Sequence, residues 1–464
     1  MAVTASSERD TVATPIQRAF REALYAGAIS FGLFVLFIGL RTDQNINNEL
    51  ILVQRWGLLA IVVAAVTIGR FLYVAYVVPA MERSKLEKAK APAVAAAEPG
   101  LVRRNFNTIG LVILFLYPVA MVLLFGFQGS LKWVDNFGIQ ILIYVMLAWG
   151  LNIVIGLAGL LDLGYVAFYA VGAYAYALLG THFGLSFWIL LPAAGAMAAF
   201  WGVMLGFPVL RLRGDYLAIV TLAFGEIIRL VLINWREVTN GSAGISGIPK
   251  VSFFGLMSFN VSDPNYISKV LGIAQSGAYY KIFLYYLILL LCLLTAFVTI
   301  RLRRLPVGRA WEALREDEIA CRSLGINTTT TKLTAFATGA MFGGFAGSFF
   351  AARQGFVSPE SFVFLESAII LAIVVLGGMG SLGGIAVAAL VMIGGTEILR
   401  ELDFLKVVFG PDFTPELYRM LLFGMAMVIV MLWKPRGFVG SREPTAFLKK
   451  RKAVSGSFTK EGHG

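Results

Sequence analysis

Residues 378–383 read Gly-Met-Gly-Ser-Leu-Gly and match G-x-G-x-x-G, a pattern whose glycines let backbone amides approach the phosphates of a dinucleotide. That chemistry requires a strand immediately before the pattern and a helix immediately after it. The flanks here are two long apolar runs, LESAIILAIVVLG and GIAVAALVMIGG, and neither predicts a strand. We therefore reject nucleotide binding at this turn. We expect Gly378 and Gly380 to permit a tight turn and close packing between two membrane helices.

Other motifs that carry chemistry are absent from the sequence. It contains no G-x-x-x-x-G-K-[S/T] phosphate loop, no H-E-x-x-H and no G-x-S-x-G. The cysteines, Cys292 and Cys321, form neither a C-x-x-C pair nor a disulfide framework, and the histidines have no neighbouring cluster of metal ligands. We therefore expect no catalytic residue, no metal site and no bound cofactor in this chain.

The composition indicates a membrane protein. Of 464 residues, 58% are hydrophobic and 14% are charged, whereas soluble proteins have about 45–50% apolar and about 25% charged residues. The apolar runs match the length that crosses a hydrocarbon core about 30 Å thick, and lipid offers no partners to backbone groups, so each run must be helical. The expected fold class is an all-α polytopic membrane protein with ten to twelve transmembrane helices. The runs lie at about 24–40, 51–78, 106–125, 139–156, 164–180, 186–208, 217–233, 281–300, 333–352, 362–378, 384–399 and 417–433.

The net charge of +12 indicates membrane orientation rather than nucleic-acid binding, because the charge falls in a few loops and tails. Twelve crossings place both termini on the cytoplasmic side together with every strongly basic segment. The loops on the opposite side, 41–50, 126–138 and 353–361, are poor in Lys and Arg. The basic segments are 79–105, Arg211 with Arg213, 301–332 and 434–464. We expect the last of these to lie on anionic lipid headgroups.

The chain is expected to have four parts. The first is an N-terminal extension, 1–78, with two transmembrane helices, and the second is a charged, Ala/Pro-rich cytoplasmic linker, 79–104. The transmembrane core follows at 105–435 and contains the cytoplasmic loop 301–332, and a basic tail, 436–464, ends the chain.

Two blocks within the core, 139–233 and 333–433, each make four crossings but begin on opposite sides of the membrane. This predicts inverted-topology halves around a central site. Equal counts can also arise by chance, so both interpretations stay open. The spacing of Gly339, Gly343 and Gly347 places bare backbone on one helix face and predicts close helix packing there.

Charged residues inside the membrane form a separate set of candidates. Glu226 and Arg229 lie three residues apart, so they share a helix face and can pair. Unpaired, each would cost about 2.5–3.5 kcal/mol near a helix centre, so we expect them to face the bundle interior or an aqueous path. A structural ion pair and a translocation-path element are both open. Asp162 lies in the turn 156–164, where it is a helix N-cap or a further path element.

The polar loop RLRRLPVGRAWEALREDEIACRSLGINTTTTK, residues 301–332, predicts a short cytoplasmic helix that begins at 308–309. Trp311, Leu314, Cys321 and Leu324 form its apolar face, and Gly325 is expected to end it in the left-handed conformation. A solvated connection is the alternative, although about thirty residues exceed what a connection needs. We expect a docking helix for a soluble partner. Its candidate docking residues are Gly308, Arg309, Glu312, Arg315, Glu316, Asp317 and Gly325.

Three stretches carry a resemblance to a known family. The loop motifs Gly308-Arg309-Ala310, REDEIA at 315–320 and LGIN at 324–327 resemble the coupling loop of ATP-binding-cassette (ABC) importer permeases. Residues 156–179 and 211–235 resemble signatures of the branched-chain, or hydrophobic, amino acid permeases. With its two extra N-terminal helices, the chain resembles the larger, M-type subunit of that family more than the shorter, H-type one. Together with residues 333–399, the three stretches cover about residues 105–435, and the N-terminal helix pair lies beyond this common core.

The resemblance implies a permease subunit of the bacterial inner membrane that translocates leucine, isoleucine or valine. A periplasmic binding protein would deliver the amino acid, and a second permease subunit would complete a heterodimer. Two ATP-binding subunits would bind ATP and Mg²⁺, and one of them would dock on 308–327. A similar machine for urea or short-chain amides is an alternative, because these motifs specify the family better than the substrate. An ion-coupled secondary transporter, which would work alone, is a third hypothesis.

Overall fold

The computed structural model describes residues 15–35, 39–44, 50–79, 106–209, 212, 214–253, 257–260, 263, 265–272, 276–401, 419–434 and 437–438. Apart from residue 79, the expected linker 79–104 lies outside these ranges. So does the expected tail, except for residues 437 and 438, and so do Arg211 and Arg213. The chain divides into two compact units, Met1–Ile109 and Gly110–Gly464.

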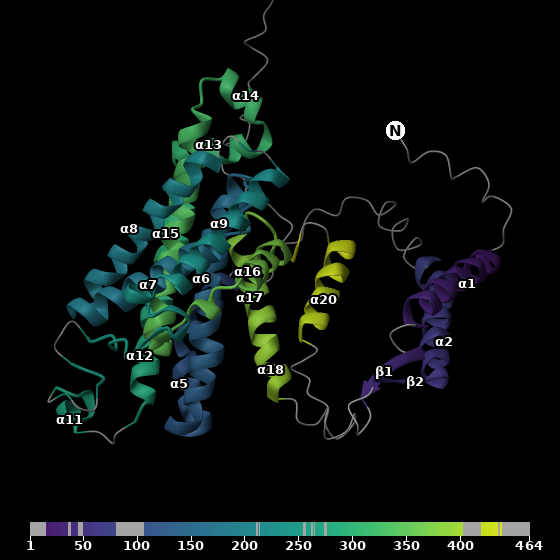
Figure 1. The fold of residues 1–464 in the computed structure, drawn as a ribbon, viewed down its shortest axis with the longest axis horizontal. Helices are drawn as coiled ribbons and strands as arrows, with labels where there is room; N and C mark the ends of the chain where they lie inside the picture. The colour runs from purple at the N-terminus through teal and green to yellow at the C-terminus, as the bar shows by residue number, and fades with distance from the viewer. Residues whose placement is uncertain are drawn as a thin grey trace, which may run out of the picture. The chain divides into compact units, whose positions relative to one another are not determined.

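The first unit contains two helices and a β-hairpin (Figure 1). Helix α1 spans Pro15–Phe34, and α2 spans Trp56–Leu72 and continues as the π-helical turn η2, Tyr73–Val77. Arg70 of α2 pairs with Glu22 of α1 at 2.8 Å.

The predicted helix over 51–78 is wrong at its start. Strand β2, Leu50–Gln54, pairs antiparallel with β1, Leu40–Gln44, in the register Leu40↔Gln54. The hairpin ladder satisfies the backbone groups of these apolar residues, so the helix begins only at Trp56.

The described part of the second unit is almost entirely helical (Figure 1). Its only described sheet is the short ladder of β3 with β4, in which Ile245 pairs with Val357. The elements through the middle of the chain are α5 (Phe106–Lys132), η3 (Trp133–Ile139), α6 (Gln140–Asn152), η4 (Ile153–Leu157), α7 (Val166–Phe183), α8 (Phe187–Val209), α9 (Asp215–Asn234), α10 (Arg236–Thr239), η5 (Gly241–Ala243), β3 (Ile245–Ser246) and α11 (Ile267–Leu271). They are followed by α12 (Ala278–Arg304), α13 (Pro306–Glu316), α14 (Glu318–Ser323), α15 (Thr328–Gln354), β4 (Phe356–Val357), η6 (Pro359–Ser361), α16 (Phe364–Gly377), α17 (Leu382–Ala389), η7 (Leu390–Gly394), α18 (Gly395–Glu401) and α20 (Arg419–Trp433).

Nine helical segments within the described ranges are long and apolar enough to cross a membrane. One of them, Gly110–Leu157, has 48 residues, more than twice the length of about 20 that one crossing needs. The Tyr117 hydroxyl donates to the Trp133 carbonyl at 3.0 Å, although these residues would be about 24 Å apart along a straight helix. The chain therefore turns back at Gly126, whose φ is +71°. This segment supplies two crossings, and the predicted all-α polytopic fold is confirmed.

Helix α15 lies at the centre of the second unit and packs on α6, α7 and α8. Glycines permit this close approach. A Cβ atom at Gly172 of α7 would overlap the Gly344 carbonyl of α15. Gly339 faces Val154 and Gly150, while Gly343 contacts Tyr165. These contacts place the small residues of α15 on the faces that touch its neighbours.

We predict that Gly172→Ala lowers the midpoint of thermal denaturation of the purified subunit in mild detergent, because forcing a methyl group into a packed interface costs about 1–3 kcal/mol. Gly395→Ala is the control, since open space surrounds a Cβ atom at that position in α18. Equal midpoints for the two variants would show that the α7–α15 contact does not require glycine.

Candidate functional site

Two short helices, α13 and α14, connect α12 to α15 at one end of the second unit (Figure 1). The single helix predicted for this loop is wrong. The chain is extended at Asp317, where φ is −158°, and the Asp317 carboxylate accepts hydrogen bonds from the Ile319 and Ala320 amides at 2.8 and 3.0 Å. An aspartate that satisfies free amides at a helix start is an N-cap, so the second helix begins at Glu318. The first helix begins at Pro306 rather than at 308, because proline suits the first helical position.

The end of α14 has the left-handed glycine that the sequence predicts. Gly325 has φ +80°, its amide donates to the Arg322 carbonyl at 3.1 Å, and the Ile326 amide donates to the Cys321 carbonyl at 3.0 Å. This pair of bonds is a Schellman motif. The next helix, α15, begins directly afterwards with Asn327 as its N-cap, accepting from the Thr330 amide at 3.1 Å.

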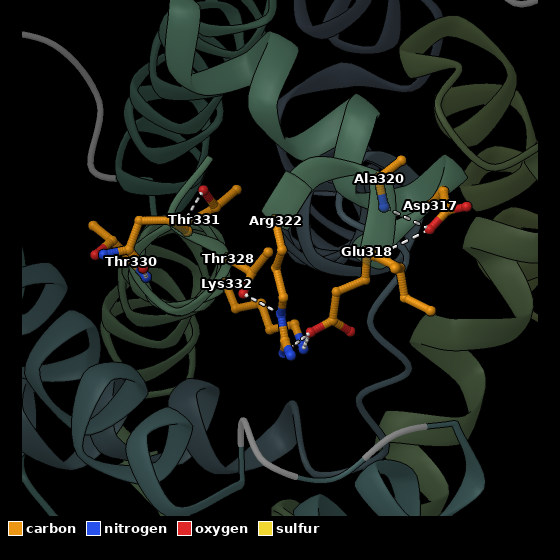
Figure 2. A network of polar contacts seen from close by, with 10 residues as sticks. Asp317, Glu318, Ala320, Arg322, Thr328, Thr330, Thr331 and Lys332 are labelled. Carbon is orange, nitrogen blue, oxygen red and sulfur yellow. Dashed lines mark hydrogen bonds and ion pairs between the residues drawn. The ribbon is translucent and has the colours of Figure 1, made fainter. Parts of the chain in front are cut away.

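Polar contacts tie the loop to the first turns of α15, and Figure 2 shows those around Glu318. The Glu318 carboxylate pairs with Lys332 at 3.0 Å and with Arg322 at 2.6 Å. On α13, the Trp311 indole is buried and donates to the Thr331 carbonyl and the Thr334 hydroxyl, each at 3.1 Å. Lys332 is only 4% exposed. Its ion pair is therefore shielded from solvent and holds α14 on α15.

The inner side of α13 contacts α12. A Cβ atom at Gly308 would overlap the Leu302 carbonyl, so the helices meet there backbone to backbone. Glu312 accepts from Arg303 of α12 at 3.0 Å. Gly308 and Glu312, which the sequence proposes as docking residues, lie against this chain's own helices.

A second set of contacts joins the loop to the G-M-G-S-L-G turn and to the end of α6. The Arg315 guanidinium donates to the Gly156 carbonyl, and Arg303 donates to the Gly380 carbonyl at 3.4 Å. The Gly380 amide in turn donates to the Asn152 side-chain oxygen of α6 at 2.8 Å. We call Asn152, Gly156, Arg303, Arg315 and Gly380 the inner clamp. The turn itself requires glycine, because Gly378 and Gly380 have φ values of +100° and +92°.

The outward surface of the loop combines charge and apolar area. Arg309, Glu316 and Asp317 are exposed, as is Gly325. Ile319 and Leu324 are 65% and 79% exposed. Leu324 was expected on the buried face with Trp311, Leu314 and Cys321, which are buried. Cys321 keeps its expected place, but α14 ends at Ser323 and Leu324 is its C-cap, so helical spacing no longer applies to Leu324.

The other candidates lie apart from this loop in the sequence. Arg229 pairs with Glu226 on α9 at 2.9 Å and lies 3.8 Å from Glu360, so the expected ion pair forms.

Asp162 does not cap α7, whose N-cap is Tyr165. Its carboxylate is buried and accepts from the Gly164 amide at 2.9 Å, while the second oxygen has no partner among the described residues. Burial raises the pKa of Asp162 to about 6.

Sequence reasoning did not identify Asn152 or Arg303. Asn152 is a single polar residue in an apolar run, and a search for polar residues near the ends of such runs would have found it. Its partner Gly380 is 228 residues away. Such a separation leaves no local pattern to read.

Helix α15 carries the three predicted packing glycines, Gly339, Gly343 and Gly347, between the loop and the opposite end of the bundle.

We predict that Arg315→Gln lowers the thermal denaturation midpoint of the subunit, because losing a partly buried hydrogen bond from a charged group costs about 1.5–3 kcal/mol. Arg309→Gln is the matched control, since Arg309 is exposed on the same helix. If both substitutions leave the midpoint unchanged, the inner clamp does not stabilise the fold.

The sequence matches known families over most of its length. The family described as "Branched-chain amino acid transport system / permease component" matches residues 134–431, and a domain of unknown function matches residues 18–117. High-affinity branched-chain amino acid transport system permease proteins of Salmonella typhimurium and Escherichia coli are 50% and 51% identical over 315 and 311 residues. These alignments cover 67% and 66% of this chain and 71% and 70% of the relatives.

A more distant relative is a probable branched-chain amino acid transport permease protein of Methanocaldococcus jannaschii. It is 24% identical over 240 residues, which cover 51% of this chain and 64% of the relative. No solved structure matches this sequence.

Proposed function

This chain belongs to the family of branched-chain amino acid transport permease components, and from that membership we propose that it translocates leucine, isoleucine and valine as a permease subunit of an ATP-driven importer. The observation that supports this most strongly is the sequence identity, 50% and 51%, with two bacterial permease proteins whose names state this substrate class. A multi-pass helical bundle with a structured loop at one end supports the same function.

The proposed importer has subunits beyond this chain. A second permease subunit completes a heterodimer, two ATP-binding subunits supply the energy, and a periplasmic binding protein delivers the amino acid. ATP and Mg²⁺ bind to the ATP-binding subunits, so this chain needs no cofactor and no catalytic residue. The location is the bacterial inner membrane. The basic loop 301–332 supports an orientation in which this loop and both termini face the cytoplasm.

The outward surface of α13 and α14 is the proposed contact with one ATP-binding subunit. It offers charges of both signs, from Arg309 and Glu316, beside exposed Ile319 and Leu324. Charged residues around apolar contacts are the usual composition of a specific protein interface. Gly308, Glu312 and Arg315 serve this contact indirectly, because they hold α13 in position from the inside.

Movement of this surface reaches the membrane by two routes. Trp311 and Glu318 connect it to α15, and Arg315 connects it to η4, which continues α6. When the ATP-binding subunits close on ATP, α13 and α14 shift and carry both helices with them. The 27 residues of α15 extend over about 40 Å, which is enough to cross the hydrocarbon core.

We predict that the double variant Arg309→Glu with Glu316→Arg abolishes ATP-driven leucine uptake while the subunit still inserts into the membrane. Reversed charges face the partner's unchanged surface, and like-charge contacts oppose docking. The measurement is initial uptake of radiolabelled leucine in cells, with the membrane content of the subunit determined by immunoblot.

The matched control is Arg236→Glu with Glu237→Arg, a similar reversal on α10, far from the loop in the sequence and exposed. Normal leucine uptake by the Arg309/Glu316 variant would contradict docking at this surface. Urea uptake is measured in parallel, because ATP-driven uptake of urea without leucine would contradict the proposed substrate class.

A further inference from the structure

A cavity of about 510 Å³ lies beside the end of α15 that is remote from α13 and α14. Residues of η3, α6, α7, α15, α16 and the η7–α18 segment line it. The volume accommodates an amino acid together with several water molecules, since one water occupies about 30 Å³ in the liquid. In the proposed orientation this cavity lies toward the periplasmic side, where the binding protein would release its cargo.

One group of lining residues carries positive charge. Arg353, near the end of α15, donates to Asp135 at 2.8 Å and to Asn136 at 3.1 Å. Lys281, which is not itself a lining residue, also pairs with Asp135, at 3.0 Å. Two cations share this carboxylate, and the Arg353 side chain is only 8% exposed. The three charged side chains together carry a formal net charge of +1 and can attract a further carboxylate.

Two lining carboxylates come from other helices. Glu366, on α16, accepts from the Tyr144 hydroxyl at 2.6 Å. Glu397, on α18, is 6% exposed. A carboxylate in such surroundings is held in place and binds cations strongly, because few water molecules compete with the ligand.

The remaining wall is apolar. Ile143 of α6, Phe350 of α15, Ile369 of α16 and the adjacent Met392 and Ile393 of η7 also line the cavity. Branched aliphatic side chains and a flexible methionine can pack against a ligand of irregular apolar shape. A cavity with an apolar wall and a few fixed polar groups has the usual character of a small-molecule site.

We propose that this cavity binds the transported amino acid itself, as a zwitterion with an aliphatic side chain. The ammonium group binds at Glu366 and Glu397, the carboxylate binds at Arg353 and Asn136, and the side chain lies on the isoleucine and methionine wall. This inference rests on the proposed function. Urea and short-chain amides carry no charge, so they cannot form ion pairs with the carboxylates or with Arg353. Because Phe350 and Arg353 belong to α15, a shift of that helix alters the site.

Thiol protection tests the site in the assembled importer, purified with its partner subunits and without the binding protein. Thr396 lines the cavity, and the native cysteines, Cys292 and Cys321, are buried. The thiol introduced by Thr396→Cys is modified with a small methanethiosulfonate reagent in the presence of different solutes. Leucine should slow the modification several-fold. Urea, 4-methylpentanoate and 3-methylbutylamine should not, since each lacks at least one of the two charges.

Charge variants in the same background test the assignment of the ammonium group. Glu366→Gln should raise the leucine concentration needed for half-protection by about tenfold or more, the loss expected from one charge-assisted hydrogen bond. Glu366→Asp keeps the charge and should retain most of the protection. Glu237→Gln, on the exposed α10, is the control and should change nothing.

The results separate this proposal from the proposed function. If the same assembly, reconstituted in proteoliposomes and supplied with the binding protein, takes up leucine with ATP but leucine protects the thiol no better than urea, the amino acid site is wrong and the importer function stands. Unchanged protection in Glu366→Gln also overturns the site as assigned. If leucine protects the thiol but ATP drives no uptake even with the binding protein supplied, the importer function is wrong while the cavity remains an amino acid site.

Discussion

The close contact of α15 with its neighbours is the constraint on which the rest of the structure depends. Glycines at Gly172 and Gly344 bring the backbones of α7 and α15 together, and Gly339 does the same toward α6. Without a hydrophobic driving force between helices in lipid, such contacts supply much of the association. A helix held on several sides by backbone contact bends little, so α15 transmits displacement along its length. The first turns of α15 contact Trp311 and Glu318, and its last turns supply Phe350 and Arg353 to the proposed amino acid cavity.

The inner clamp adds a second connection of different chemistry. Arg303 and Arg315 donate to backbone carbonyls, so the contacts depend on the position of the main chain rather than on the neighbouring side chains. Hydrogen bonds from guanidinium groups are stronger than neutral ones. The G-M-G-S-L-G turn therefore connects Arg303 to Asn152, although its sequence matches a nucleotide-binding pattern. Its glycines allow a backbone conformation in which Gly380 accepts from Arg303 while its amide bonds to Asn152.

Local patterns in the sequence predicted much of this arrangement. Apolar runs gave the helices of the bundle, three-residue spacing gave the Glu226–Arg229 pair, and the position of Gly325 gave the end of α14. The hairpin of β1 and β2 was missed because apolar content alone does not separate a strand from the start of a membrane helix. The expected domain boundaries and inverted halves stay predictions.

Contacts between distant residues could not be predicted in this way. Asp135 and Arg353 are 218 residues apart, and Tyr144 and Glu366 are 222 apart. Asp135, Arg353 and Glu366 each have an ordinary explanation as a charge near a helix end, and Tyr144 is one aromatic residue in an apolar run. Only the folded bundle brings both signs of charge to one apolar cavity. For the same reason the sequence offered Glu226, Arg229 and Asp162 as path candidates but gave no reason to choose the residues around the cavity.

The most direct test of the central claim, that this chain is the permease subunit of an ATP-driven importer, is its purification in mild detergent with mass spectrometry and an ATPase assay of the complex. The account predicts a stable assembly that contains two ATP-binding subunits and a second permease subunit, with ATPase activity that rises when a leucine-loaded binding protein is added. Recovery of this chain alone, able to transport leucine in proteoliposomes with an ion gradient and no ATP, would contradict it.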